Sequence, residues 1–373
     1  MSNTSPTGRQ RTVRLASVTM LILGLALGPT ACSLGGTTSE SEGTAEQEGA
    51  PENTQVVLAT HESWSVPDKV LAEFTRETGY EVEVQASGDA GALTNKLVLT
   101  QGSPIADVVY GVDNTFASRA VEEGVFEDYE PQDAPASVGG FEMPDDAGAA
   151  ALTPVDFGDV CVNVDDAWFE DQGVEPPRTL EDLTEPRYRD LFVTPGATTS
   201  SPGLAFLLAT IAEFGEDGWQ EYWTELMSNG TRVTAGWTDA YTVDFTAGGG
   251  GGDRPIVLSY ASSPPFTIPE GGEEPTTSAL LDTCFRQVEY AGVLDGAANP
   301  EGARALVDFM LSESFQEALP ENMYVFPVDD SVELPDVWAR WAKVPENPLS
   351  VDPSTIAENR DAWLTTWGEI TTR

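Results

Sequence analysis

The chain has few of the residues that enzymes use most often. Its 373 residues include one histidine and three cysteines. A Ser-His-Asp triad would have to use His61, and the chain contains no G-x-S-x-G motif. The ligands left in the mature chain if Cys32 carries a lipid are two cysteines and one histidine, which are too few for a conventional zinc cluster. We therefore expect no enzyme, although 62 acidic residues always contain carboxylate pairs suited to acid-base catalysis.

Positive charge is also scarce. Only 18 lysines and arginines stand against the acidic residues, which gives a net charge of −44 and a pI near 4.1. Nucleic acid and anionic membrane surfaces would be repelled, so we expect neither as a partner. An acidic surface mainly favours solubility and secondarily favours cationic ligands. Nothing in the composition indicates a cofactor.

Long apolar runs are absent except for one short run near the N-terminus. Residues 15–27 are mostly apolar, and Arg9, Arg11 and Arg14 precede them. This order is typical of a secretory signal, and the apolar run is too short to span a membrane. The sequence therefore predicts an exported protein.

Cys32 directly follows a small residue, which resembles the cleavage site of a bacterial lipoprotein. Pro29 is a departure from that pattern, because leucine is usual at this position. We expect a signal peptide over residues 1–32 and a lipid on Cys32. That lipid would anchor the protein to the outer face of the cytoplasmic membrane, at the cell surface or in the periplasm. Residues 33–54 are rich in Ser, Gly, Thr and Glu and predict a disordered tether.

Two cysteines remain once Cys32 is assigned to the lipid. In an oxidising compartment Cys161 and Cys284 are candidates for a disulfide. The alternative is two separately buried thiols.

Apolar runs alternate with helical patterns after the tether. The runs at 56–59, 80–84 and 106–110 predict strands, and helices separate them. This order predicts a parallel sheet of the α/β class, which binds ligands beyond the carboxyl ends of its strands. Candidate ligand-binding residues at those ends are His61, Ser63, Trp64 and Asp113.

Further strands are expected near the two cysteines, and they flank a long middle insertion. We therefore predict two α/β lobes, each with a mixed sheet flanked by helices. Residues 55–157 and 286–373 would form the first lobe, although the C-terminal tail may also pack on the second. Residues 158–285 would form the second lobe.

Two neighbouring segments combine aromatic rings with a carboxylate. Trp237, Asp239 and Tyr241 lie within the segment 236–241, and a strand at 256–258 leads to Tyr260. Ring faces attract positive charge, and a carboxylate supplies a counter-charge, so the pattern suits a flat organic cation. The alternative is that these rings belong to the core.

A serine-proline pair predicts the start of a helix. We expect Ser201 to cap a helix over 204–214, with Pro202 at its first position. Ser200 and Ser201 would together provide a donor-rich wall for a ligand, or they would serve only as a helix cap.

The five glycines at 248–252 lack the Lys-Ser/Thr of a phosphate loop, so they predict a flexible surface turn.

Several of these segments together resemble the periplasmic thiamine-binding proteins of bacterial ABC import systems. The resemblance runs from about residue 56 to the end, and its most specific motifs are T-S-S-P-G at 199–203 and G-W-T-D-A-Y at 236–241. It implies a two-lobed type II periplasmic-binding-protein fold, a monomer, a permease partner, and thiamine or a thiamine phosphate as the ligand. His61 and Phe266 depart from the family pattern, which has tyrosines there.

The resemblance also implies a set of ligand contacts. Trp237, Tyr260 and Tyr324 would be aromatic walls, Asp89 and Asp113 acidic contacts, and Ser200 and Ser201 donors that meet a phosphate. Tyr241 and Phe266 complete the expected site. Another cation on the same fold, such as a polyamine or ferric iron, is an alternative ligand. A structural or adhesive lipoprotein without a small ligand is an alternative of a different class.

Overall fold

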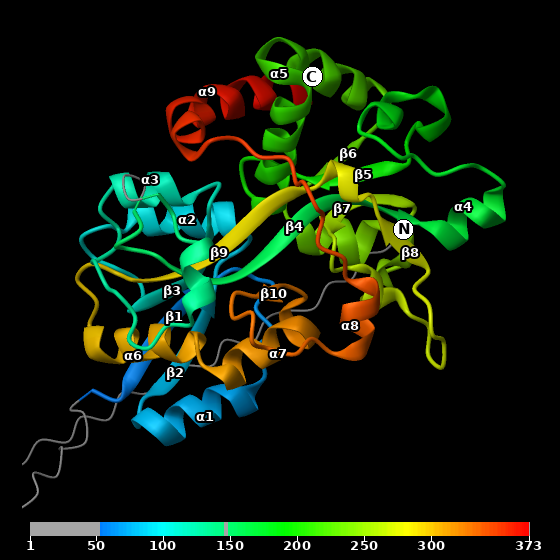
Figure 1. The fold of residues 1–373 in the computed structure, drawn as a ribbon. Helices are drawn as coiled ribbons and strands as arrows, with labels where there is room; N and C mark the ends of the chain where they lie inside the picture. The colour runs from blue at the N-terminus through cyan, green and yellow to red at the C-terminus, as the bar shows by residue number, and fades with distance from the viewer. Residues whose placement is uncertain (1–52, 145–147, 373) are drawn as a thin grey trace, which may run out of the picture. The chain divides into compact units, whose positions relative to one another are not determined.

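The computed structural model describes residues 53–144 and 148–372. The expected signal peptide, Cys32 and the tether as far as residue 52 lie outside these described residues. Figure 1 shows strands at the centre with helices around them. Within the described residues, no helix combines the length and the apolar character that crossing a membrane requires.

The first elements form the predicted parallel unit. Strand β1 pairs in parallel with both β2 and β3, and Gly79 ends the first helix in the left-handed conformation. The prediction of a β-α-β-α-β unit is therefore confirmed. Its elements are β1 (Gln55–Thr60), α1 (Asp68–Thr78), β2 (Glu81–Ala86), α2 (Ala90–Leu99) and β3 (Val108–Asp113).

The strands of the described residues form one mixed sheet of ten strands, ordered β2-β1-β3-β9-β4-β7-β5-β6, with β8 and β10 both paired to β4. The apolar run at 160–164 predicts a short strand, but strand β4 is much longer. Its first half pairs with β9 and its second half with β7, so hydrogen bonds continue through the whole sheet. A separate sheet for each predicted lobe is therefore not seen. The remaining strands are β4 (Thr153–Asp165), β5 (Phe192–Pro195), β6 (Arg232–Thr234), β7 (Ile256–Tyr260), β8 (Thr277–Ala279), β9 (Phe285–Val293) and β10 (Phe326–Pro327).

The apolar spacing over residues 300–317 predicts one helix, but the structure has two helices there. Ser312 accepts the backbone N–H of Phe315 on its hydroxyl, which caps a new helix and interrupts the predicted one. The helix predicted from residue 204 begins earlier and continues past a kink at Gly215. The helices beyond β3 are α3 (Ala117–Glu122), α4 (Asp166–Gln172), α5 (Ser201–Ser228), α6 (Pro300–Met310), α7 (Glu313–Met323), α8 (Asp336–Trp341) and α9 (Pro353–Thr371).

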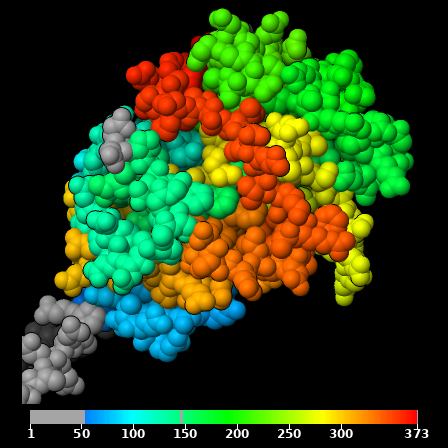
Figure 2. All heavy atoms as spheres, in the orientation of Figure 1, coloured from blue at the N-terminus to red at the C-terminus, as the bar shows by residue number. Residues whose placement is uncertain are grey.

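The C-terminal helix packs on α5. Trp367 of α9 meets Trp223 of α5 edge-on, with ring centroids 5.6 Å apart, and Trp363 Nε1 donates to Glu216 Oε2 at 3.2 Å. Figure 2 shows the red C-terminal residues against the green residues of α5. These rings share one buried cluster with β4 and β7, whereas α1, α6, β1 and β3 surround another. The chain therefore returns to the α5 side of the sheet after α8.

A disulfide joins Cys161 of β4 to Cys284, the residue before β9. Both cysteines are fully buried. The predicted disulfide is confirmed, and the alternative of two separate thiols is wrong. The bond closes a segment that contains β5 to β8 and α5.

Candidate functional site

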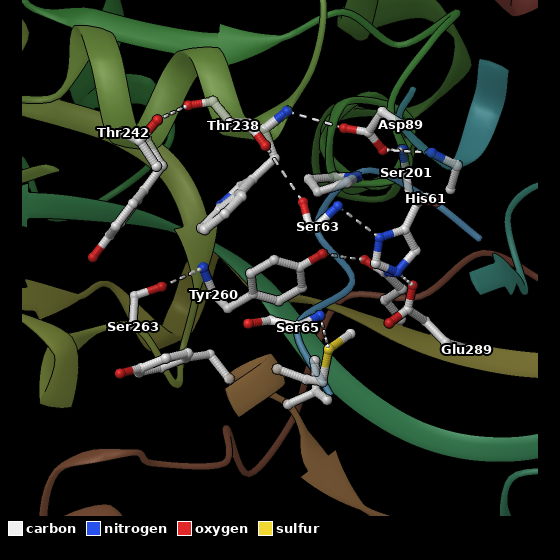
Figure 3. Close-up of a pocket in the computed structure, with 18 of the residues that line it drawn as sticks. His61, Ser63, Ser65, Asp89, Ser201, Thr238, Thr242, Tyr260, Ser263 and Glu289 are labelled. Carbon is white, nitrogen blue, oxygen red and sulfur yellow. Dashed lines mark hydrogen bonds and ion pairs between the residues drawn. The ribbon is translucent and has the colours of Figure 1, made fainter. Parts of the chain in front are cut away.

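A cavity of about 260 Å³ collects side chains from segments that lie far apart in the sequence. It receives His61 after β1, Trp237 after β6, Tyr260 at the end of β7, Glu289 within β9 and Tyr324 after α7 (Figure 3). The sheet brings these strand ends together. Most of the predicted ligand-binding residues line it: His61, Ser63, Asp89, Ser201, Trp237, Tyr241, Tyr260, Phe266 and Tyr324.

Two of the predicted residues do not line the cavity. Trp64 is partly buried and packs its ring edge-on against Tyr110 of a neighbouring core cluster, with centroids 5.1 Å apart. Asp113 accepts the backbone N–H and the hydroxyl of Thr115, at 2.8 and 2.6 Å. Burial raises the pKa of Asp113 to about 6, although these hydrogen bonds oppose the rise.

Ser200 and Asp239 also lie off the cavity. Ser200, and not Ser201, caps α5, because its hydroxyl accepts the backbone N–H of Gly203. The expected cap is therefore displaced by one residue, and Ser201 is the residue that reaches the cavity. Asp239 is exposed at the start of the next helical segment and does not line the cavity.

Hydroxyl groups hold the first aromatic wall in place. Trp237 stacks on Tyr241 with centroids 5.0 Å apart, and its Nε1 donates to Ser259 Oγ at 2.9 Å. Ser259 Oγ lies 2.8 Å from Ser263 Oγ, which accepts the backbone N–H of Tyr260 at 3.1 Å. One hydrogen-bonded chain therefore links the Trp237 ring to the backbone of Tyr260.

The second aromatic wall comes from two loops. Phe266 belongs to the short helix η7 (Pro264–Thr267) and is half exposed. Its ring meets Tyr324 edge-on, with centroids 5.3 Å apart. Tyr324 ends α7 in the left-handed conformation at φ 58°, which is costly for a large side chain and is typical of functional sites. The Ser262 hydroxyl donates to the Tyr324 carbonyl at 2.6 Å and ties the two loops together.

The glycine run supports this site instead of forming a free turn. A π-helix, η5 (Asp239–Asp244), carries Tyr241, and segments of this kind are frequent at functional sites. A side-chain carbon on Gly248, Gly250 or Gly252 would collide with the carbonyl oxygen of Tyr241, Thr242 or Asp244, respectively. Alternate glycines therefore let the run lie directly on the π-helix. The expectation of a merely flexible turn was wrong, because the constraint is close backbone approach.

We expect Gly250→Ala to lower the free energy of unfolding by about 1–3 kcal/mol, the usual cost of overpacking. Gly250 has no left-handed φ, so the collision with Thr242 is the only obstacle to alanine. Urea unfolding would measure the change. Gly140→Ala is the matched control, since a side-chain carbon there meets nothing within 4 Å. Equal stability of the two variants would contradict the supporting role.

Asp89 joins three segments around the cavity. Its Oδ1 accepts the backbone N–H groups of Ala90 at 2.7 Å and Ser201 at 3.4 Å, at the starts of α2 and α5. Its Oδ2 accepts the Trp237 N–H at 2.9 Å. The carboxylate therefore caps α2 and links the starts of α2 and α5 to the backbone of Trp237 (Figure 3).

Glu289 is the main site residue that the sequence analysis missed. His61 Nε2 lies 3.3 Å from Glu289 Oε1, and Tyr110 donates to Asp156 Oδ2 at 2.6 Å and to Glu289 Oε2 at 3.3 Å. Burial alone would raise the pKa of Glu289, but the charge of His61 and the hydrogen bonds have the larger combined effect, so the pKa of Glu289 is lowered. Burial and the charge on Glu289 hold the pKa of Asp156 well above its usual range. Glu289 is therefore the ionised member of this carboxyl pair.

Most of the other missed residues are small or polar. Hydroxyl and amide groups of this kind carry no distinctive sequence pattern, although Pro202 and Thr238 lie in the motifs at 199–203 and 236–241. The missed lining residues are Ser65, Ala90, Pro202, Thr238, Thr242, Ser263, Gln287, Glu289, Asn322, Met323 and Val325. The described part of the chain has no group of three or more His, Cys, Asp or Glu side chains placed to hold a metal ion.

The chemistry of the cavity suits a flat cation. Aromatic faces line two walls, the carboxylates of Asp89 and Glu289 supply negative charge, and none of the described lining residues is lysine or arginine. A mixed sheet whose strand ends and loops meet at one such cavity defines a solute-binding protein. The family model of the bacterial extracellular solute-binding proteins matches residues 103–253.

Individual relatives define the family more closely. The thiamine-binding periplasmic protein of Brucella suis is 30% identical over 83% of this chain and 89% of its own length. That of Escherichia coli is 28% identical over 83% of this chain and 90% of its length. The solved structure of a periplasmic thiamin binding protein superposes with a TM-score of 0.75 at 27% identity, covering 87% of this chain and 98% of that one.

The chain belongs to the family of bacterial thiamine-binding periplasmic proteins. Its relatives are solute-binding proteins of the type II fold, in agreement with the fold class and the non-enzymatic role expected from the sequence.

Proposed function

We propose that this protein captures thiamine outside the cytoplasm and delivers it to an ABC importer. The observation that carries the proposal is the pairing of aromatic walls with two carboxylates in one cavity that has no lysine or arginine among its described lining residues. The family relationship supports the same ligand.

Thiamine has two parts that match the cavity. Its thiazolium ring carries a fixed positive charge, which is attracted by the ring faces of Trp237 and Tyr260 and by the carboxylate of Glu289. Its flat aminopyrimidine carries an amine that needs hydrogen-bond acceptors. The hydroxyl and amide oxygens of Ser63, Thr238 and Asn322 offer such acceptors around the cavity.

The family relationship supports the delivery role. Three further proposals concern the lipid anchor, the closure of the lobes and the oligomeric state. As a member of an extracellular family the protein is exported, and a lipid on Cys32 would hold it near the permease. Residues 55–157 with 286–373 would act as one lobe and residues 158–285 as the other, and the two would close over the ligand. Asp89 and the Ser63–Thr238 hydroxyl contact at 3.5 Å connect these segments at the cavity. We propose that the protein works as a monomer.

Phosphate esters of thiamine are proposed as further ligands. The start of α5 favours negative charge by about 0.3–1 kcal/mol, or about 2 when partly buried, whereas the cavity carboxylates oppose it. We therefore expect thiamine and its monophosphate to bind within about tenfold of each other, with Ser201 near the phosphate. Ser201→Ala should weaken the monophosphate more than thiamine. Ser200→Ala is the matched comparison, because Ser200 caps the helix without lining the cavity.

Competition titrations would test this expectation. A monophosphate that binds a hundredfold more weakly than thiamine would contradict it. So would a Ser201→Ala variant that loses both ligands equally, since the serine would then hold only the part that the two ligands share.

Native mass spectrometry of the protein purified without added ligand would test the proposed function, because tight receptors often retain ligand. We expect a bound mass equal to thiamine or one of its phosphates. A retained polyamine or iron would support a different cation receptor on the same fold. Failure to retain or take up any of these ligands would favour a structural lipoprotein.

A further inference from the structure

The only histidine of the chain lies at the cavity between a carboxylate and a backbone amide. His61 Nε2 faces Glu289 Oε1 at 3.3 Å, and His61 Nδ1 accepts the Ser63 N–H at 3.2 Å (Figure 3). The imidazole also lies on Gly111, where any side-chain carbon would collide with the ring. The ring is therefore held in one orientation, with a different partner at each nitrogen.

The carboxylates around His61 favour its protonated form. Burial lowers the pKa of His61, but Glu289, Asp89 and Asp113 outweigh burial, and the pKa is raised above its usual value. The titratable groups around the ring are Glu62 beside it in the chain, Asp89 at the start of α2, Tyr110 and Asp113 on β3, Asp156 on β4, Tyr260 on β7 and Glu289 on β9.

The contact with Ser63 favours the neutral form of His61. An imidazole nitrogen that accepts a hydrogen bond carries no proton, so the observed ring has its proton on Nε2, facing Glu289. A second proton, on Nδ1, must displace the Ser63 N–H. Ser63 also lines the cavity, with its hydroxyl 3.5 Å from Thr238 Oγ1. The protonation state of His61 is thus linked to the position of a cavity-lining residue.

We propose that a cationic ligand and the second proton of His61 exclude each other, so that ligand binding releases a proton from this side chain to solvent. The inference rests on the proposed function, which places a fixed positive charge in the cavity. Two positive charges beside one carboxylate, Glu289, repel each other strongly in a buried site. When the Nδ1 proton leaves, the Ser63 N–H bonds to Nδ1, Nε2 still faces the Glu289 carboxylate, and the remaining negative charge attracts the ligand.

The sign of the pH dependence follows directly. The bound cation lowers the pKa of His61 from its raised value in the free protein. Above the free-protein pKa the affinity is constant. Between the two pKa values the affinity falls by about tenfold for each unit by which the pH drops, because binding must expel one proton.

The single imidazole makes a direct measurement possible. Its NMR signals, followed by pH titration of the protein without a histidine tag, would give the pKa with and without thiamine. We expect a lower pKa with thiamine. Calorimetry in phosphate and Tris buffers at a pH between the two pKa values should then show proton release approaching one per thiamine, and about half of that at the free-protein pKa. An identical imidazole pKa in both states, with no proton release, would overturn the inference.

Two variants separate this effect from the titration of thiamine itself. His61→Gln removes the titrating group, so both the proton release and the steep pH dependence of affinity should disappear. Glu289→Gln removes the carboxylate that raises the His61 pKa, so the pH dependence should move to lower pH. If either variant fails to fold, the NMR titration of the unmodified protein still decides the question. Absence of saturable thiamine binding at every pH would instead refute the proposed function.

Discussion

Replacing Trp237 with alanine is expected to raise the dissociation constant for thiamine at least tenfold. A desolvated contact between a cation and an aromatic ring is worth about 2 kcal/mol, and each 1.4 kcal/mol is a factor of ten in affinity. The variant also loses the partner of Tyr241 and of the Ser259 hydroxyl, which hold the aromatic wall in place. Calorimetric titration would measure the change.

Trp341→Ala is the matched control, because Trp341 belongs to α8 and does not line this cavity. It should bind thiamine as the unmodified protein does. Trp237→Phe keeps an aromatic face but loses the bond to Ser259, so its affinity should lie between those of the unmodified protein and the alanine variant. An unchanged affinity in a folded Trp237→Ala variant would remove this ring from the proposed site.

Removing the disulfide by replacing Cys161 and Cys284 with alanine should lower the free energy of unfolding by roughly 2–5 kcal/mol. The two cysteines are 123 residues apart in the sequence, so the bond restricts a long segment of the unfolded chain. Urea unfolding of the variant would measure the loss.

Chemical reduction provides the control for this experiment. The reduced unmodified protein should unfold near the midpoint of the double variant, and a reducing agent should not change the variant further. Two free thiols, assignable to Cys161 and Cys284, on the unreduced protein would contradict the bond itself.

Local sequence patterns predicted the parts of the fold that local chemistry determines. The apolar runs before His61 and Tyr110 and the glycine at residue 79 predicted the parallel unit at β1 to β3. The length of β4 was not predictable in this way. Its first half contains Pro154, Asp156 and Gly158, which are unfavourable in strands, and pairing with β9 overrides those preferences.

The candidate site was predicted where a residue type is distinctive. Trp237, Tyr260 and Tyr324 stand out as aromatic rings beside turns, and the structure brings them to one cavity. Glu289 does not stand out, because one glutamate among 62 acidic residues has no pattern that marks it as buried. Its role depends on His61 and Tyr110, which reach it only through tertiary structure. The support that the glycine run gives to η5 also depends on contacts across space.

Calorimetric titration of the purified protein with thiamine tests the central claim most directly. The proposed function predicts saturable binding of one thiamine per protein molecule, with an affinity that falls in the Trp237→Ala variant and is retained in the Trp341→Ala variant. A folded protein that shows no saturable binding of thiamine would contradict the proposed function.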